Sequence, residues 1–282
     1  MLARNNPGVP KARRSLPDRI PGTGMRRLLY IALAACGTNE TPQPMPAPTL
    51  PECVPNRDGM ITADELPIAL GATVDYYTST NTAVNLVAQN SIWDLSQERS
   101  TDQVIALGPV ALGAQWYASQ FPSGQFVVDA GSGLDGIYHQ DAQALWLDGT
   151  ASQADGANKT LIVYPTPLPV LRFPVTDGEM FTATVDFTAT IDGLPFNGSD
   201  ELDVDVTGSG RLDVPYVQFS PTLRVREKAV RRTGTASVTK RTTIFLFECF
   251  GEVARAESKQ DETNADFTTA AYLRRFALGV TP

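Results

Sequence analysis

The feature that most constrains the fold is the segment Phe181–Ile191, in which apolar and polar side chains alternate at every position. A period of two residues places one set of side chains in a core and the other in solvent, as in a half-buried β-strand. Asp192-Gly193 then supplies a turn pair. Glu201–Val206 alternates again, with carboxylates on one face and aliphatic side chains on the other. These two runs predict neighbouring strands of an antiparallel sheet.

Most of the chain after residue 68 follows a similar pattern. Short runs of β-branched and aromatic residues alternate with Gly, Asp and Ser turns, and the 22 Gly and 21 Pro residues favour many short elements over long helices. Only Val104–Ala118 and Asp266–Phe276 also suit a helix. Four prolines in Tyr164–Pro174 predict an edge strand or a crossover. The sequence therefore predicts a mostly-β domain with few short helices.

The N-terminal region has the pattern of an export signal. Residues 25–37 read MRRLLYIALAACG, with two arginines, an apolar run at Leu28–Ala35 and small residues before the cut site. The apolar run is less than half the length that spans a bilayer, which favours a cleaved signal over a permanent transmembrane helix. The Leu-Ala-Ala-Cys sequence resembles the lipobox of bacterial lipoproteins. That resemblance implies cleavage before Cys36 and lipidation of Cys36.

The domain organisation follows from this interpretation. Residues 1–35 are expected to be leader and lipoprotein signal, and translation from Met25 would leave residues 1–24 unmade. Residues 36–52, rich in Pro and Thr, predict a partly extended tether, and residues 53–282 a single mostly-β domain. Two alternatives remain open: a secreted protein without a lipid, and a cytosolic protein whose apolar run belongs to its core.

Cleavage before Cys36 leaves a strongly acidic chain. Residues 1–35 hold seven of the 23 basic and one of the 31 acidic side chains, so 16 basic and 30 acidic residues remain, with a net charge near −14. Nucleic acids and anionic headgroups repel such a chain, and we expect neither as a partner. We expect attachment to the membrane of the cell envelope through the N-terminal lipid, on the periplasmic or surface face.

The chain has three cysteines. If Cys36 carries the lipid, Cys53 and Cys249 remain, and an even number in an oxidising compartment predicts a disulfide. The alternative is that Cys249, inside the apolar segment IFLFECF, is a buried free thiol.

Residues 54–65 resemble an EF-hand calcium loop. The candidate metal ligands, at EF-hand positions three, five, seven, nine and twelve, are Asn56, Asp58, the Met60 carbonyl, Thr62 and Glu65. The first ligand position holds Val54, which has no side-chain oxygen. Thr62-Ala63-Asp64-Glu65 also has the pattern of a capping box, which predicts a rigid turn beside Cys53. Calcium binding and a rigid turn are therefore competing interpretations, and no other cofactor is expected.

Two charged rows have the spacing of strand faces. They are Glu201, Asp203 and Asp205, and Arg224, Arg226 and Lys228. Opposite charges on adjacent strands pair across the ladder and help to set its register, which is the interpretation we favour. The alternatives are a cation site on the acidic row and contact with anionic lipid or polysaccharide on the basic row.

Motifs for catalysis are missing from the sequence. His139 is the only histidine, which excludes a two-histidine metal site and allows a Ser-His-Asp arrangement only in principle. Ser132 lies in DAGSGLDG, which is typical of a loop between strands and does not match G-x-S-x-G. We therefore expect a non-enzymatic protein, with His139 on an edge strand.

Three segments resemble those of a class of bacterial outer-membrane-type lipoproteins with mostly-β domains. They are Phe173–Phe181, which opens a long strand, Leu223–Arg226 in mid-sheet and Phe245–Val253 near the end. The resemblance implies a curved antiparallel sheet, as a half-barrel, a flattened barrel or a sandwich, and it assigns no catalytic residues. We expect a cell-envelope protein that binds an apolar or small ligand or an envelope protein. The alternatives are a structural or assembly role without a ligand, or a hydrolase or calcium-binding protein.

The concave face of such a sheet decides between a carrier and a scaffold. An open apolar cavity suits a carrier, and a filled core suits a scaffold. The apolar residues expected to line the concavity are Phe181, Val185, Phe187, Leu202, Val204 and Phe247.

Overall fold

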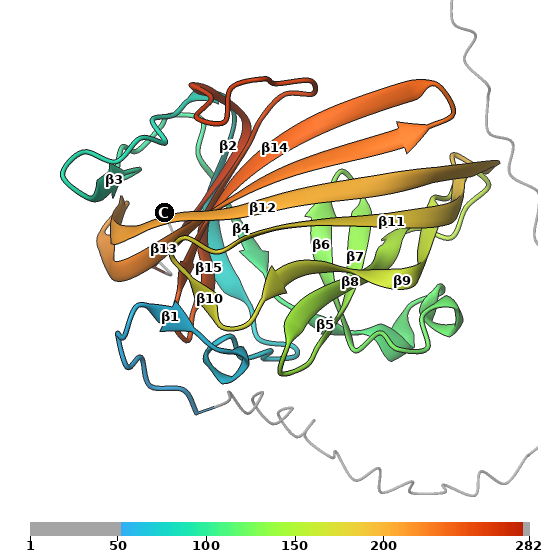
Figure 1. The fold of residues 1–282 in the computed structure, drawn as a ribbon, viewed down its shortest axis with the longest axis horizontal. Helices are drawn as coiled ribbons and strands as arrows, with labels where there is room; N and C mark the ends of the chain where they lie inside the picture. The colour runs from blue at the N-terminus through green and yellow to red at the C-terminus, as the bar shows by residue number, and fades with distance from the viewer. Residues whose placement is uncertain (1–51, 279–282) are drawn as a thin grey trace, which may run out of the picture. The chain divides into compact units, whose positions relative to one another are not determined.

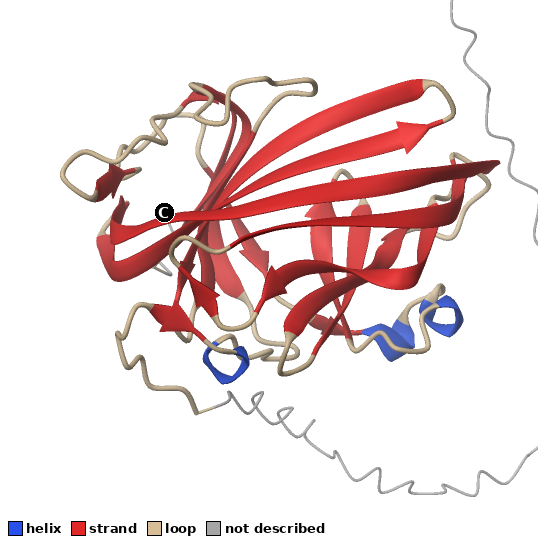
Figure 2. Cartoon of the chain, in the orientation of Figure 1, coloured by secondary structure: helices blue, strands red, loops and turns tan. Residues whose placement is uncertain are grey.

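The computed structural model describes residues Glu52–Leu278, which lie within one compact unit. The expected leader, signal and Cys36 lie outside the described residues. Within Glu52–Leu278 the chain consists almost entirely of strands (Figure 2). The helices there are single 3-10 turns, η1 (Ala63–Glu65), η2 (Leu112–Ala114) and η3 (Ala118–Gln120). None of these turns has the length and hydropathy needed to cross a bilayer.

The strands form one 14-stranded sheet and one two-stranded sheet (Figure 1). In chain order they are β1 (Met60–Ile61), β2 (Val74–Ala83), β3 (Ile92–Asp94), β4 (Gln103–Leu107), β5 (Val110–Ala111), β6 (Phe126–Gly131), β7 (Leu134–Gln140), β8 (Ala144–Ser152), β9 (Leu161–Arg172), β10 (Val175–Thr176), β11 (Met180–Ile191), β12 (Leu194–Val214), β13 (Val217–Thr233), β14 (Ala236–Phe247), β15 (Gly251–Glu257) and β16 (Thr269–Phe276). The order in the large sheet is β4-β2-β16-β15-β14-β13-β12-β11-β9-β8-β7-β6-β5, with β3 parallel to β12. β1 pairs with β10. The predicted mostly-β, antiparallel fold is confirmed.

The two edge strands of the large sheet are neighbours in the sequence. β4 ends at Leu107 and β5 begins at Val110, so only Gly108-Pro109 separates them. Gly108 allows a close backbone approach, because a Cβ there would lie 1.9 Å from the Ala72 carbonyl oxygen. The chain thus links the two edges, although within the described residues no ladder joins them and the sheet is not closed into a barrel. A sheet with linked edges must curl, which brings its two halves face to face.

The alternating run found in the sequence forms β11, which pairs with β12 from Met180↔Asp205 to Ile191↔Leu194. Asp192-Gly193 is the predicted turn, and positive φ values of 49° and 78° suit a two-residue hairpin loop. All the apolar residues of the run belong to one core cluster or pack against it. On β12, the aliphatic side chains of Glu201–Val206 are buried in the same cluster. The predicted faces of both strands are confirmed.

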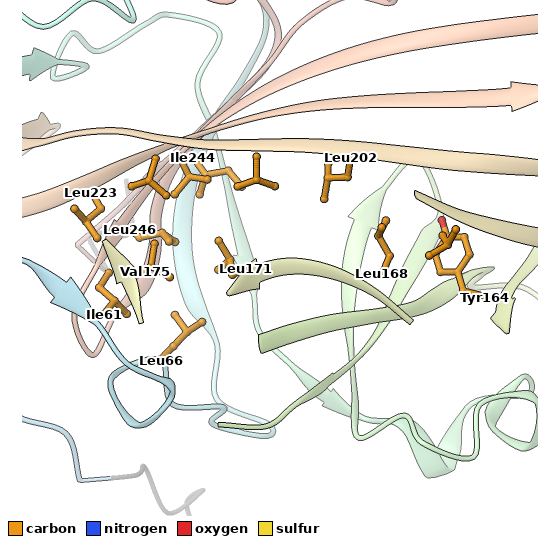
Figure 3. Close-up of a cluster of buried hydrophobic side chains, with 14 of the residues drawn as sticks. Ile61, Leu66, Tyr164, Leu168, Leu171, Val175, Leu202, Leu223, Ile244 and Leu246 are labelled. Atoms are coloured by element: carbon orange, nitrogen blue, oxygen red, sulfur yellow. The ribbon is translucent and has the colours of Figure 1, made fainter. Parts of the chain in front are cut away.

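An apolar core fills the concave side of the sheet between β9 and the long strands. Figure 3 shows Tyr164, Leu168 and Leu171 of β9 facing Leu202 of β12 and Ile244 of β14. Ile61 of β1, Leu66 just after η1 and Val175 of β10 extend the same cluster at one end. Five of the residues expected in the concavity belong to this core or pack against it, so in this region the concave face is filled.

Phe247 is the exception among those residues. It lies in a second cluster on the convex face, because Ile244 and Leu246 of β14 contact the concave core and alternation turns Phe247 the other way. The segments 84–102 and 258–268 cover this convex face and contribute Trp93, Leu95 and Phe267 to its cluster. Both faces of the central strands are therefore covered by protein. The apolar core with β9 covers the concave face, and the segments 84–102 and 258–268 cover the convex face.

Buried arginines hold the covering segments on the convex face. Arg275 of β16 has no exposed surface and donates to the carbonyls of Leu95 and Gln97 and to both carboxylate oxygens of Asp102, at 2.6 to 3.0 Å. Arg224 of β13 similarly donates to the Leu86 carbonyl at 2.7 Å. These contacts satisfy carbonyl groups that a loop over an apolar surface would otherwise leave without partners.

Neither segment that suited a helix forms an α-helix, so those predictions were wrong. Val104–Ala118 contains most of β4, all of β5 and η2 and the first residue of η3, and Asp266–Phe276 contains β16. The reason is visible at Arg274 and Arg275, which bind partners on opposite faces of the sheet. A helix does not place adjacent side chains on opposite faces, whereas the side chains of a strand alternate between the two faces at every residue.

The proline-rich strand β9 is neither a simple edge nor a crossover. It pairs with β8 from Leu161 to Arg172, but with β11 only through Leu161–Val163. Pro165 and Pro167 lie where the β8 ladder shifts register, between Val163 and Leu168, and Pro169 is opposite Trp146 in that ladder. The start of β9 therefore has a partner strand on both sides, whereas the rest has one on one side at most. A proline is tolerated there because its missing N–H is not needed by a second ladder.

The two charged rows lie on adjacent strands, as expected. Lys228 binds Asp203 at 2.9 Å, and their Cα atoms are register partners. Arg226 is opposite Asp205 in register but pairs with Asp266 of the covering segment instead. Cross-strand pairing is thus confirmed for Lys228 and Asp203. Arg224 and Arg226 instead bind the segments that cover the convex face.

Candidate functional site

Cys53 and Cys249 form the predicted disulfide, with their Cα atoms 5.5 Å apart and a sequence separation of 196 positions. The Cys249 amide also donates to the Glu65 carbonyl at 2.8 Å, and the Arg57 amide donates to the Glu248 carboxylate at 2.7 Å. The segment that follows the expected tether is therefore attached to the turn between β14 and β15 by one covalent bond and two hydrogen bonds.

The oxygens of the EF-hand-like loop are used inside the loop. Glu65 accepts from the Asn56 side-chain amide at 2.7 Å and from the Thr62 amide at 2.9 Å. Asn56 accepts from the Asp58 amide at 2.8 Å, and Asp58 from the Met60 amide at 2.9 Å. The bond from Thr62 to Glu65 is the carboxylate half of the predicted capping box. Four of the five candidate ligands, Asn56, Asp58, Thr62 and Glu65, thus lie in one network that stabilises a turn, and Met60 joins it through its amide and not through its carbonyl.

This network favours the rigid-turn interpretation of the loop. Val54 is 76% exposed and adds no side-chain oxygen. Among residues 52–278, no group of three or more His, Cys, Asp or Glu side chains is placed to hold a metal ion. Calcium would have to displace several of the hydrogen bonds to Glu65 and Asn56. Calcium binding stays a prediction, and a weak site is what this geometry allows.

A surface pocket of about 420 Å³ lies next to this turn. It is lined by Thr62, Ala63, Asp64, Gln140, Asp141 and Ala142. The Gln140 amide nitrogen donates to the carbonyls of Ala63 and Leu66, at 2.9 and 3.2 Å, so this side chain joins η1 to the end of β7. The pocket brings the N-terminal segment against the β7–β8 turn, with carboxylates on both sides.

His139 lies on β7, between β6 and β8, so the expectation of an edge strand was wrong. Its Nδ1 is 2.7 Å from a carboxylate oxygen of Asp148, and its ring stacks on Trp146. Burial raises the pKa of the Asp148 carboxyl, and the contact with His139 opposes that shift. Within the described residues no serine, threonine or cysteine side chain hydrogen-bonds to His139, and Ser132 lies in the turn between β6 and β7. The pair alone does not make a nucleophilic site.

A cluster of charged side chains that the sequence analysis did not identify lies on the concave face, beyond the apolar core. Its members, here called the concave ionic cluster, are Glu227 of β13, Glu252, Arg255 and Glu257 of β15, and Arg274 of β16. Ladder positions place them together: Ile244 of the core is opposite Arg255, and Arg255 is opposite Arg274. The cluster therefore continues the same face on which the core lies.

A β-bulge in β15 creates the centre of the cluster. The register between β14 and β15 shifts at Phe245/Leu246, and Val253 and Ala254 are both buried in the convex cluster. Glu252 and Arg255 therefore point to the concave face together, although they are three residues apart. Arg255 donates to one oxygen of Glu252, at 2.7 and 2.9 Å, and Arg274 donates to the other, at 3.0 Å through Nε.

These contacts set the charge of Glu252. Burial raises the pKa of its carboxyl, but Arg255 and Arg274 lower the pKa by more, to about 2. Glu257 pairs with Lys240 and lies 3.9 Å from Arg255. The side chains of Glu252, Arg255, Glu257 and Arg274 keep 12 to 26% exposure, so solvent reaches this part of the concave face.

Glu227 differs from the other members of the cluster. It is half-buried, and no hydrogen bond or ion pair from any residue in Glu52–Leu278 reaches its carboxylate. Burial raises its pKa, Arg255 opposes this, and Glu252 and Glu257 raise it further, to about 7. The carboxyl group therefore changes charge near neutral pH.

Tyrosines surround the cluster. The Tyr76 hydroxyl donates to the Glu252 carbonyl at 2.9 Å, and burial with the nearby Glu252 charge raises the pKa of Tyr76 to about 12. Tyr138 comes from β7, in the other half of the sheet, yet burial raises its pKa, Arg255 opposes this shift, and the charges of Glu227 and Glu252 add to it. β7 therefore lies near enough to the cluster for its charges to act on Tyr138.

Gly136 makes room for the Tyr138 ring. A Cβ at Gly136 would lie 2.6 to 2.9 Å from atoms of that ring, including its hydroxyl oxygen at 2.8 Å. Tyr138 also stacks on Phe126, with ring centroids 5.7 Å apart. The ring is thus held along β7, with its hydroxyl over the glycine.

Sequence reasoning missed this cluster because its signal is spread over three strands. Glu252 and Arg255 have no strand-like spacing until the bulge is known, and Arg274 lies in a segment that also suited a helix. The only local signal was the density of charge in Glu252–Glu257, which is equally typical of an exposed strand.

Comparisons with known proteins identify no relative. No protein-family model matches the chain, and neither the curated proteins nor the solved structures include a significant match.

Proposed function

We propose that this protein is a lipid-anchored component of the bacterial cell envelope, whose β-domain binds a small ligand or an envelope protein without catalysing a reaction. The observation that carries the proposal is the pairing of Cys53 with Cys249, which leaves Cys36 as the one cysteine for the lipobox. Stable disulfides are typical of exported proteins. The acidic charge of the chain after Cys36 supports anchoring by lipid rather than by electrostatic attraction.

The filled apolar core supports surface contacts over the transport of a large apolar ligand. Tyr164, Leu168 and Leu202 occupy the space that such a ligand would need. The ionic character of the rest of the concave face likewise favours a polar ligand. A scaffold that binds only envelope proteins is the second candidate, and the covered convex face favours it, because a rigid sheet is a suitable platform.

Metabolic labelling tests the anchor. The full chain, expressed in a bacterium that processes lipoproteins and is fed an alkyne fatty acid, is expected to carry the label and to fractionate with membranes. Cys36→Ser should abolish both. The matched control, Cys53→Ser with Cys249→Ser, should keep the label, because those cysteines serve the disulfide. Recovery of an unprocessed polypeptide with a free thiol at position 36 would overturn the proposal.

A further inference from the structure

We propose that the concave ionic cluster is a binding site for a small organic cation, with the Glu227 carboxylate as its counter-ion and the Tyr138 ring as its opposite wall. This inference rests on the ligand-binding role proposed above, but it does not depend on the lipid anchor. It follows from the pairing of charges, from the access of solvent and from the aromatic side chains around the cluster.

One carboxylate of the cluster, that of Glu227, has no ion-pair partner among the described residues. Arg255 and Arg274 both bind Glu252, and Lys240 binds Glu257. Glu227 remains the one carboxylate of the cluster with no cation bound to it within Glu52–Leu278. Because partly buried charges are usually paired, an unpaired carboxylate facing two others marks a place where an added cation is stabilising.

The groups that face Glu227 come from several strands. Arg255, Glu252 and Glu257 of β15 act on the pKa of Glu227, and the charge of Glu227 in turn raises the pKa of Tyr138 of β7. On β14, Thr242 is its register partner. Arg255 is the one cation among the groups that act on Glu227, and its guanidinium already binds Glu252. An incoming cation therefore meets a carboxylate that the protein itself leaves only partly compensated.

Solvent access extends from the cluster toward the β13–β14 turn. On the same face, Ala229 follows Glu227 in strand alternation and is exposed, and its register partner Lys240 is 49% exposed. On the opposite side of the cluster the apolar core begins at Val225 and Ile244. A ligand group thus approaches from the turn and stops where the core begins.

Aromatic rings beside the carboxylate favour an organic cation over a metal ion. Arg274 already lies over the Tyr76 ring, 5.0 Å from its centroid, which shows that a cation is accommodated on this face. Within the described residues no cation lies over the Tyr138 ring. A metal ion needs several oxygen ligands, and none of the described acidic clusters is placed to hold one. An alkylammonium needs one counter-ion and apolar contact, which Glu227 and Tyr138 supply.

Titration with tetramethylammonium tests the site, because this probe keeps its charge at every pH. Binding to the purified full chain can be followed by saturation-transfer NMR of the methyl protons, at constant ionic strength. Since the pKa of Glu227 is about 7, we expect the affinity to increase about tenfold from pH 6 to pH 8. Glu227→Gln should weaken binding at pH 8 by about tenfold and remove the pH dependence.

Matched controls separate the site from general charge effects. Glu201→Gln removes a carboxylate of β12 that pairs with Arg232, and it should leave the affinity and its pH dependence unchanged. The neutral probe tert-butanol should bind the wild type no more tightly at pH 8 than at pH 6. Equal affinity of Glu227→Gln and the wild type at pH 8, with both folded by circular dichroism, would overturn the proposal. So would the absence of saturable binding to the wild type, whatever the labelling of Cys36 shows.

Discussion

Charged side chains on the two faces of β16 differ in burial and in pairing, as the adjacent residues Arg274 and Arg275 show. Arg275 faces the convex side, has no exposed surface, and binds Asp102 and two loop carbonyls. Arg274 faces the concave side, keeps 12% exposure and shares Glu252 with Arg255, while Glu227 nearby has no ion-pair partner among the described residues. The charges on the convex face thus attach the covering segments to the sheet. The charges on the concave face stay partly exposed, and the Glu227 carboxylate is the group that we propose binds a ligand.

The largest effect is expected from breaking the convex attachment. Arg275→Met should lower the free energy of unfolding by about 3–5 kcal/mol, because it leaves Asp102 and two carbonyls buried without their main partner. Urea unfolding measures the change. Arg232→Met is the control: Arg232 pairs with Glu201 but is 43% exposed, so its loss should cost less than about 1 kcal/mol. Similar losses for the two variants would remove the distinction between the faces.

Glu252→Gln should have a smaller but clear effect on the concave side. It removes the shared counter-ion of Arg255 and Arg274, and because solvent still reaches these guanidinium groups, we expect a loss of about 1–3 kcal/mol at pH 7. The folded pKa of Glu252 is lowered to about 2, so its stabilisation is present above pH 4.5 and is lost as the pH falls through 2. The variant should therefore unfold with a weaker dependence on pH in this acid range, as measured by circular dichroism. An unchanged acid transition would contradict the assignment.

Glu227→Gln should stabilise the protein in mildly alkaline solution. The folded pKa of Glu227 is raised to about 7, so its contribution is fully favourable below about pH 4.5 and is lost as the pH rises through 7. At pH 8 the ionised group is a cost, and its neutral isostere should gain about 1–2 kcal/mol. Thermal unfolding at pH 5 and pH 8 compares the two proteins. A loss of stability at pH 8 would mean that the carboxylate has a partner in the folded protein.

The smallest effect is expected at the predicted cross-strand pair. Lys228 and Asp203 are both about one-third exposed, so Lys228→Met should change the free energy of unfolding by less than about 1 kcal/mol. The change should shrink further in concentrated salt, which screens exposed pairs. A loss as large as that of Arg275→Met would show that exposure does not separate structural from superficial charge in this sheet.

Local sequence was informative wherever a side chain's role depends on its immediate neighbours. Alternation in Phe181–Ile191 and Glu201–Val206 predicted two strands and their buried faces, and Asp192-Gly193 predicted the turn between them. The Cys53–Cys249 bond followed from counting cysteines, and the capping-box pattern at Thr62–Glu65 from spacing. Each of these inferences needs only a short stretch of chain or a small number of equivalent residues.

The same reasoning failed where partners are distant in sequence. Asp266–Phe276 suited a helix because nothing local shows that Arg275 binds Asp102, 173 residues away. Phe247 was assigned to the concavity because both faces of β14 are apolar, so alternation predicts a strand without saying which face is inside. Glu252 and Arg255 were not connected, because a bulge cannot be read from their spacing.

By itself the sequence determined that the chain forms an antiparallel β-domain, where several of its strands and turns lie, and which cysteines are available to pair. The tertiary structure decided how the sheet curls through Gly108-Pro109, which side of each strand faces the core, and which charges are left without partners. The physical reason is that alternation is a local property of the chain, whereas the energy of a charge depends on every group that folding brings near it.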